Sequence, residues 1–189
     1  MKKQITLIVL LAIVGAALAV AQAPVTGSAD PESLFTSKDK KLNANKQVVL
    51  HIVRDLLEAG HWDDAPKYLT KEYIQHNPNV ASGLEPVLKF FAGRPSKAIP
   101  AKNAWATKVV SVTAEGDLVS VAIVREFDDP RTPGKKYTTT WFDMWRIKDG
   151  KADEHWDGAT IAAPAPGPAR GAAPVQGDVP PPRGRGERK

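Results

Sequence analysis

Apolar residues recur at helical spacing between Asn43 and Gly60. They stand at i, i+3, i+4, i+7 and i+8, namely Val49, Ile52, Val53, Leu56 and Leu57. The polar residues of the segment, His51 and Asp55 among them, fall on the opposite side of such a helix. The pattern predicts an amphipathic helix of about four turns that ends at Gly60. We expect His51 to face water.

Two shorter helices are predicted further along. The first spans residues 63–69, begins at Asp63 or Asp64, and accepts Pro66 in its first turn. The second spans residues 84–91, and its apolar stripe consists of Leu84, Val87, Leu88 and Phe91. Between them, the Asn-Pro pair that follows His76 ends a helix or turn. We therefore expect His76 at the edge of a loop.

Beyond Pro100 the helical spacing gives way to runs rich in β-branched and aromatic residues. These runs predict strands at 104–112, 118–127, 137–147 and 151–156, joined by turn-forming sequences. Consecutive strands with short connections form an antiparallel meander. Helices followed by such a sheet predict an α+β fold: a cone-shaped, curved antiparallel sheet covered on one face by the N-terminal helices, with a pocket at its mouth.

The basic character of the chain belongs to its two ends. Of the formal net charge of +5, residues 1–23 contribute +2 and residues 159–189 contribute +3. The body is therefore neutral, which argues against a groove that follows a nucleic-acid backbone. The chain has no Cys, which excludes disulfides, a thiol nucleophile and Cys-ligated metal centres.

The first residues have the pattern of an export signal. A basic start is followed by an apolar run from Ile5 to Val20 and by small residues up to Ala23. This layout predicts a signal peptide over residues 1–23, cleaved near Ala21 or Ala23. The run is shorter than the ~20 residues that span a bilayer. We expect a periplasmic or extracellular protein without a stable membrane anchor.

Two further segments have the composition of unstructured chain. Residues 24–41 are predicted to be a flexible lead-in. The stretch 159–189 holds seven Pro and five Gly and almost no large apolar residue, so it is predicted to be a disordered Pro/Ala/Gly/Arg tail. Its arginines could tether it to an acidic surface; the alternative is a plain linker end.

The last predicted hairpin carries the candidate chemistry. Its turn, Lys148-Asp149-Gly150, suits a type I turn with a bulge that pairs Ile147 with Lys151. That register places Asp143 opposite His155 and Trp141 opposite Asp157. One face then carries Trp141, Asp143, Trp145, His155 and Asp157, and the other carries Phe142, Met144, Arg146, Glu154 and Trp156. A two-residue turn would instead pair Asp143 with Trp156 and separate it from His155.

In the bulged register an Asp carboxylate reaches an imidazole. Directly opposed Cβ atoms lie ~4.5–5.5 Å apart, so Asp143 can bond to His155 and fix its tautomer. Such a pair can remove a proton from the carbon next to a carbonyl and return it elsewhere, without a metal. The alternative is a purely structural cross-strand pair, and His76 could equally do no more than bond a nearby carbonyl.

Two stretches resemble the motifs of SnoaL-like proteins. The string Tyr73 to Pro78, with Gly83 and the run 88–91, is similar to the first motif. The stretch from Trp141 through the Asp149-Gly150 turn to Asp157 is similar to the second. These proteins belong to the nuclear-transport-factor-2-like superfamily of cone-shaped α+β folds. The resemblance covers about residues 42–158.

The resemblance implies cofactor-free and metal-free acid/base chemistry on a small carbonyl compound, of the aldol, isomerase or cyclase type. It makes Asp143 and His155 the proton-transferring pair and His76 a second acid or an orienting group. The residues implied to line the pocket are Trp141, Trp145, Asp157 and Tyr73. Two positions depart from the usual pattern: Ala152 replaces a branched aliphatic residue, and Trp141 replaces a smaller one, which could narrow the pocket.

Other functions stay open at this point. The same cone could bind a small apolar ligand without converting it, so that ligand would bind and no product would form. Alternatively, Phe142, Met144 and Trp156 on the outer sheet face form an apolar patch that could join two copies into a homodimer scaffold.

Overall fold

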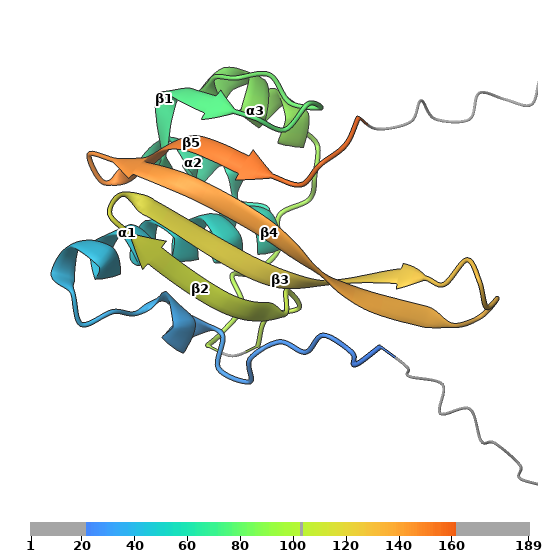
Figure 1. The fold of residues 1–189 in the computed structure, drawn as a ribbon. Coiled ribbons are helices and arrows are strands. Elements are labelled where there is room, and N and C mark those ends of the chain that lie inside the picture. The colour runs from blue at the N-terminus through green and yellow to red at the C-terminus, as the bar shows by residue number, and fades with distance from the viewer. Residues whose placement is uncertain (1–21, 103, 162–189) are drawn as a thin grey trace, which may run out of the picture.

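The computed structural model describes residues 22–102 and 104–161, and shows one curved sheet with its helices gathered on one side (Figure 1). Nearly all of the predicted signal peptide and of the predicted tail, residues 1–21 and 162–189, lies outside the described residues. None of the helices in the described ranges has the length and apolar character needed to cross a membrane.

The predicted meander forms the larger part of the sheet. Strands β2 (Val109–Glu115), β3 (Leu118–Asp128), β4 (Lys136–Lys148) and β5 (Lys151–Asp157) pair in sequence and antiparallel. Each lies close to its predicted range, although β2 begins five residues later than the sequence pattern indicated. The predicted α+β class is confirmed.

A fifth strand was not predicted. Strand β1 (Leu69–Gln75) pairs in parallel with β5, so the sheet is mixed and its order is β1-β5-β4-β3-β2. Within β1 only Leu69 and Tyr73 are buried, because the pairing with β5 shifts register between Leu69 and Ile74. Lys71, midway between them, is exposed, so β1 lacks the regular alternation of buried and exposed residues by which a strand is recognised in a sequence.

The long predicted helix is two helices in series. Helix α1 (Lys40–His51) is capped by Asp39, whose side chain accepts a hydrogen bond from the Leu42 N–H at 2.9 Å, and it continues as the π-helix η2 (Ile52–Glu58). A π-turn has more residues than an α-turn and rotates the side chains that follow. Asp55, predicted on the polar face, is 4% exposed, and Leu57, predicted in the apolar stripe, is 45% exposed.

The buried Asp55 binds His51 and draws it away from solvent. Hydrogen bonds from His51 Nδ1 and Arg54 Nε, both 2.7 Å long, reach its two carboxylate oxygens. Burial alone would raise the pKa of Asp55, but these two hydrogen bonds outweigh burial and hold the pKa below its usual value. His51 also stacks on Tyr68, so it is half-buried, contrary to the prediction that it faces water.

The segment predicted as a flexible lead-in is packed against the body. The 3-10 helix η1 (Glu32–Phe35) buries Phe35 completely in the core. Upstream, the Ser28 N–H donates to the Val109 carbonyl at 2.7 Å and the Val25 N–H donates to Thr138 Oγ1 at 2.7 Å. One large aromatic side chain and these bonds fix a stretch whose composition suggested disorder.

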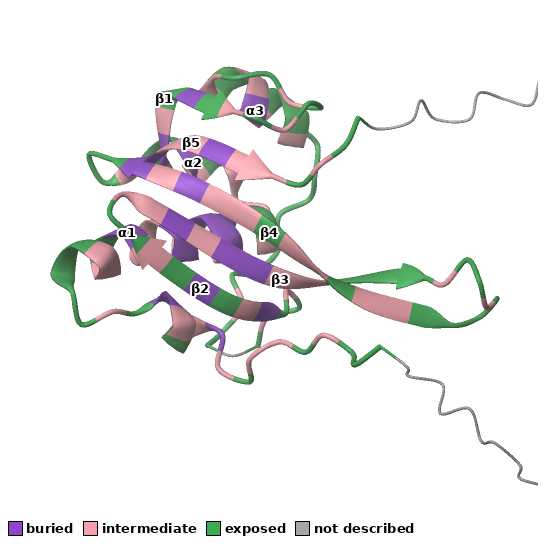
Figure 2. Ribbon diagram, viewed as in Figure 1, coloured by how far each residue is buried: buried purple, intermediate pink, exposed green. Residues whose placement is uncertain are grey.

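The remaining helices complete one side of the core. The 3-10 helix η3 (Trp62–Asp64) leads into α2 (Ala65–Tyr68), and α3 (Leu84–Phe91) lies where the sequence predicted it. Buried and more exposed residues alternate along the strands (Figure 2), because one face of the sheet packs on the helices and the other meets solvent. Trp145 on β4 is among the largest fully buried side chains of the packed face.

Candidate functional site

The turn between β4 and β5 has two residues, and the predicted three-residue turn is wrong. Asp149 and Gly150 both have positive φ, 50° and 75°, as a type I′ turn requires. Lys148 therefore pairs with Lys151, and Ile147 with Ala152. Had the hairpin continued in this register, Asp143 and His155 would lie on opposite faces.

A β-bulge restores the shared face. The register shifts between Arg146 and Ile147, so that Asp153 is an additional residue on β5. Beyond the bulge Trp145 pairs with His155, and Asp143 pairs with Asp157 rather than with His155. The predicted partners are wrong by two positions, and an even displacement leaves every side chain on its predicted face.

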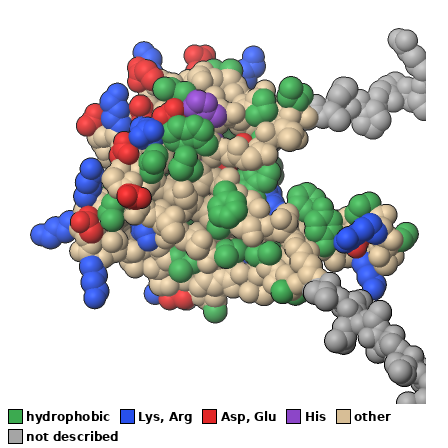
Figure 3. All heavy atoms as spheres, viewed as in Figure 1, with side chains coloured by type: hydrophobic (Ala, Val, Ile, Leu, Met, Phe, Trp, Pro, Cys, Tyr) green, Lys and Arg blue, Asp and Glu red, His purple; other side chains and the backbone are tan. Residues whose placement is uncertain are grey.

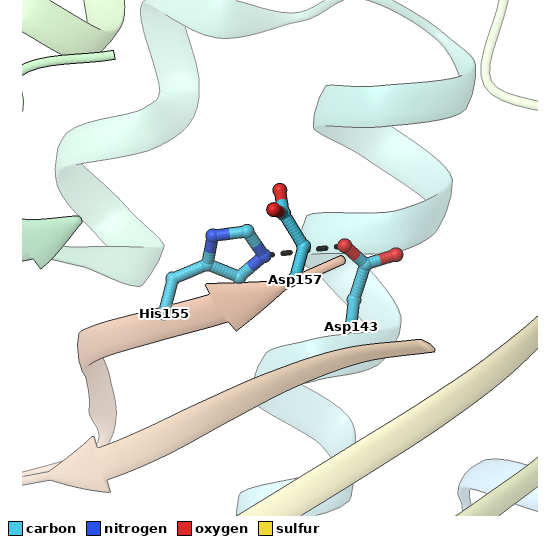
Figure 4. A group of neighbouring side chains, drawn as sticks. All are labelled: Asp143, His155 and Asp157. Atoms are coloured by element: carbon cyan, nitrogen blue, oxygen red, sulfur yellow. Dashed lines mark hydrogen bonds and ion pairs between the residues drawn. The ribbon is translucent and has the colours of Figure 1, made fainter. Parts of the chain in front are cut away.

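The bulge brings three ionisable side chains together. Asp143 from β4 and both His155 and Asp157 from β5 project from the same side of the hairpin (Figure 4). His155 Nε2 lies 3.2 Å from Asp143 Oδ1, diagonally across the strands, and His155 is only 8% exposed. The predicted Asp–His pair is therefore present, although its two members are not directly opposed.

Gln75, and not Asp143, fixes the tautomer of His155. Gln75 Oε1 accepts a hydrogen bond from the Asn77 N–H at 3.1 Å, which identifies that end of the amide as its oxygen. The same oxygen lies 2.7 Å from His155 Nδ1, so Nδ1 carries a hydrogen and donates it. The bond between Nε2 and Asp143 then requires one further proton, which the imidazole and the carboxyl group share.

The two carboxylates differ in how many of their oxygens already accept a hydrogen bond. Both oxygens of Asp157 accept hydrogen bonds, from the Ala159 N–H at 2.9 Å and from Asn77 Nδ2 at 2.7 Å. In Asp143, Oδ1 accepts from Trp141 Nε1 and from His155, while Oδ2 has no hydrogen-bond partner among the described residues. Asp143 thus has one oxygen held in place and one available to a ligand.

Tyr73 supplies a neutral hydrogen-bond donor beside this pair. Its hydroxyl oxygen accepts from Trp145 Nε1 at 3.0 Å, and within the described chain its own proton has no acceptor. Burial raises the pKa of the Tyr73 phenol, so the hydroxyl keeps its proton at neutral pH. The group can therefore donate to a carbonyl oxygen.

These side chains line one cavity of about 460 Å³ between the packed face of the sheet, η2 and α3. Its walls are largely apolar, with Val53, Val87 and Ile123 among the lining residues, and Trp62 stacked on Phe91 forms one side. Each of the four predicted lining residues borders the cavity, namely Tyr73, Trp141, Trp145 and Asp157. The volume suits a small organic ligand.

His76 does not belong to this cavity, which corrects its predicted place in the site. Its Nε2 lies 2.8 Å from Glu154 Oε1, its ring stacks on Trp156, and its side chain is 44% exposed. Glu154 and Trp156 face outward on β5, so His76 belongs to the outer face of the sheet. Its hydrogen bond is the main cause that lowers the pKa of Glu154.

The sequence prediction missed Gln75 and Asn77, the neighbours of His76. Both border the cavity and hold His155 and Asp157 in place. Residues in a strand alternate between faces, so the positions two and four after the buried Tyr73 point the same way as Tyr73. Assigning a strand here would have selected Gln75 and Asn77 instead of His76.

The Asp143, His155 and Asp157 group also has donor atoms of the kind that binds a metal ion. One ligand atom from each residue lies within 4.8 Å of the other two. A metal ion at His155 Nε2 would replace the shared proton, and the Nδ1 bond to Gln75 is the outer contact typical of metal-bound histidine.

The comparisons with known proteins identify the family. The sequence profile of the SnoaL-like domain matches residues 50–155, more than half of the chain. The chain belongs to the SnoaL-like family. This confirms the resemblance seen in the sequence motifs. A search of curated proteins gives no match to this SnoaL-like chain.

Solved structures similar to the SnoaL-like chain include TsrD from Streptomyces laurentii, with 19% identity and a TM-score of 0.42 over 64% of this chain and 90% of that one. A de novo designed protein with a curved β-sheet has 23% identity and a TM-score of 0.41, over 62% and 84% of the two chains. An epoxide hydrolase of the LEH-like type from M. tuberculosis has 13% identity and a TM-score of 0.43, over 60% and 80%.

Proposed function

We propose that this SnoaL-like domain is an acid/base catalyst that moves a proton on a small carbonyl compound. One observation carries the proposal: Asp143 offers a free oxygen to an apolar cavity while its other oxygen is bonded to the buried His155. A carboxylate positioned in this way is a general base whose protonated partner stands next to it.

The proposed reaction begins at Asp143. Its free oxygen takes a proton from the carbon next to the carbonyl group, and the electron pair of that C–H bond forms an enolate. The Tyr73 hydroxyl donates a hydrogen bond to the developing oxyanion. Asp143 then delivers that proton to a different atom, which gives isomerisation. Alternatively, the enolate carbon attacks the carbonyl carbon of a second molecule and the alkoxide that forms takes the proton from Asp143, which gives an aldol product.

The test follows exchange of α-hydrogens for deuterium in acetophenone and 2-tetralone by NMR. Replacing Asp143 by Asn should slow exchange by about 10²- to 10⁴-fold. His76→Gln is the matched control and should leave the rate unchanged, because His76 lies outside the cavity. Exchange that is equally fast in the Asp143→Asn variant contradicts the proposal. Loss of exchange on adding EDTA would assign Asp143, His155 and Asp157 to a metal ion instead.

A ligand-binding module is the second candidate, favoured by the apolar walls of the cavity. In that case both ketones shift cavity resonances, yet no exchange occurs on prolonged incubation.

We also propose that the chain is exported and cleaved near Ala21 or Ala23. The support is the basic start, the apolar run and the small residues that follow. Sequencing the N-terminus of the protein recovered from its native host should give a first residue at Gln22 or Pro24. An N-terminus that still carries Met1 would contradict export.

Finally, we propose that two copies associate through the outer sheet face. Hydrophobic side chains gather on that face (Figure 3), and Phe142 is 60% exposed beside Met144 and Trp156. The nearby Arg146 is neutralised by Asp117 and Glu154. A second copy would therefore meet an apolar face of low net charge, which favours self-association.

A further inference from the structure

The arginines in the described part of the chain fall into two groups. Three of the five form ion pairs with carboxylates: Arg54, Arg131 and Arg146. Arg94 and Arg125 make no side-chain hydrogen bond or ion pair with any described residue. These two are also the arginines that line the cavity.

Arg125 stands at the outer end of the cavity. On β3 it shares a face with Val121 and Ile123, which pair with Asp143 and Trp141 on β4. Four residues of strand, about 13 Å, separate Arg125 from the level of Asp143. Its guanidinium lies over the Trp141 ring, 5.2 Å from the centroid, and the residue is exposed.

Arg94 reaches the same cavity from the segment after α3. Its guanidinium lies 4.5 Å from the Phe91 ring centroid and 5.2 Å from that of Phe90, and the residue is exposed. A guanidinium that stacks on a ring through its flat face keeps the N–H donors along its edge. Both arginines are thus held by aromatic rings and retain unused donors.

The charges in the cavity are separated along its length. Asp143 and Asp157, paired across β4 and β5, lie at the inner end, Arg125 lies at the outer end, and Arg94 lines the same cavity from the segment after α3. An anionic group is repelled from the inner end and attracted to the outer end, where a guanidinium can bind a carboxylate through two hydrogen bonds. The apolar walls between the two ends accept an uncharged body.

We propose that the cavity binds carboxylate-bearing ligands, with Arg94 and Arg125 holding the carboxylate at the mouth. The apolar body lies against Trp62, Phe91 and Trp141, and the far end of the ligand reaches Asp143 and His155. The substrate of the reaction is then a keto acid or a similar acidic carbonyl compound. That last identification rests on the proposed function, whereas the binding of the carboxylate does not.

Calorimetric titration of the purified full chain tests the proposal with two inert probes, 1-naphthylacetate and its neutral amide, 1-naphthylacetamide. We expect the acid to bind at least tenfold more tightly than the amide, and added salt to reduce this preference. Arg94→Gln and Arg125→Gln should each weaken acid binding fivefold or more and leave amide binding within twofold. Arg131→Gln is the matched control, because Arg131 is paired with Asp129 away from the cavity.

Three results would overturn the proposal: equal affinity for acid and amide, equal loss of both in the arginine variants, or no binding of either probe by the wild type. Thermal melting of each variant shows whether it is folded. Asp143→Asn separates this proposal from the catalytic one. It should slow ketone exchange by about 10²- to 10⁴-fold and retain or tighten acid binding, so failure of catalysis leaves the carboxylate site intact.

Discussion

The chemistry of the site depends on hydrogen bonds made by single residues. Gln75 Oε1 accepts from His155 Nδ1, and so the other ring nitrogen faces Asp143. Trp141 Nε1 bonds the same oxygen of Asp143 and leaves the second oxygen open. Trp145 Nε1 occupies the Tyr73 oxygen and leaves the phenol proton available. Each group is therefore held by one contact and offers another to a ligand.

Tyr73→Phe isolates one of these contacts. It removes the acceptor of the buried Trp145 N–H, so the free energy of unfolding at neutral pH should fall by about 1–3 kcal/mol. Because burial raises the pKa of the Tyr73 phenol, its contribution is complete below the ordinary tyrosine pKa of about 10 and is lost as the pH rises further. Urea unfolding at pH 7.5 and pH 10.5 should show a smaller difference at the higher pH. A difference that grows with pH would contradict the assignment.

At the scale of elements, irregular local geometry positions the site. The β-bulge at Asp153 places His155 and Asp157 on the cavity side, and the π-helix η2 buries Asp55 and turns Leu57 toward the cavity. Regular geometry in either element would give a different inner surface.

Deleting Asp153 tests the bulge. Without it, Glu154 follows Ala152 directly, and the regular register of the two-residue turn still pairs Arg146 with Glu154 and Asp143 with Asp157. His155 and Asp157 therefore stay on the cavity face, and the free energy of unfolding should fall by no more than about 1–3 kcal/mol, from the lost contacts of the Asp153 side chain. Asp153→Ala is the control, because it keeps the residue count and loses only the bond from Thr70 Oγ1 and the ion pair with Lys148. Urea unfolding and near-ultraviolet circular dichroism measure both variants. Similar losses in the two are expected, and a much larger loss in the deletion variant would show that the bulge itself is needed to hold β5 in place.

At the scale of the whole molecule, the two sides of the sheet carry different kinds of side chain. The inner side carries the cavity, which two carboxylates and two arginines line. The outer side carries the apolar group Phe142, Met144 and Trp156, together with the His76–Glu154 pair. Association through the outer side would leave the cavity open to solvent.

Phe142→Lys tests association of two copies. Placing a charge on the outer sheet face should weaken self-association at least tenfold, as measured by sedimentation velocity over a range of concentrations. Phe127→Lys is a matched control, because Phe127 is 45% exposed but lies on the β3–β4 extension outside the apolar group. A wild-type chain that sediments as a monomer at every concentration would rule out the dimer.

Local patterns were enough to predict much of the molecule. Periodicity located α3 and the four antiparallel strands, and the motifs around His76 and around the last hairpin identified the family. The face shared by Trp141, Asp143, Trp145, His155 and Asp157 was also predicted, since alternation along a strand is a local property. The Asp143–His155 pair followed from it.

Only the tertiary structure decided the rest, because the deciding contacts join residues far apart in sequence. β1 is a strand because it pairs with β5 some eighty residues later, and that pairing sends His76 outward and brings Gln75 to His155. The bulge at Asp153 depends on the fit of β5 between β4 and β1. The chemistry of the site could be predicted from the sequence, but which oxygen of Asp143 is free, and which arginines line the same cavity, required the packed chain.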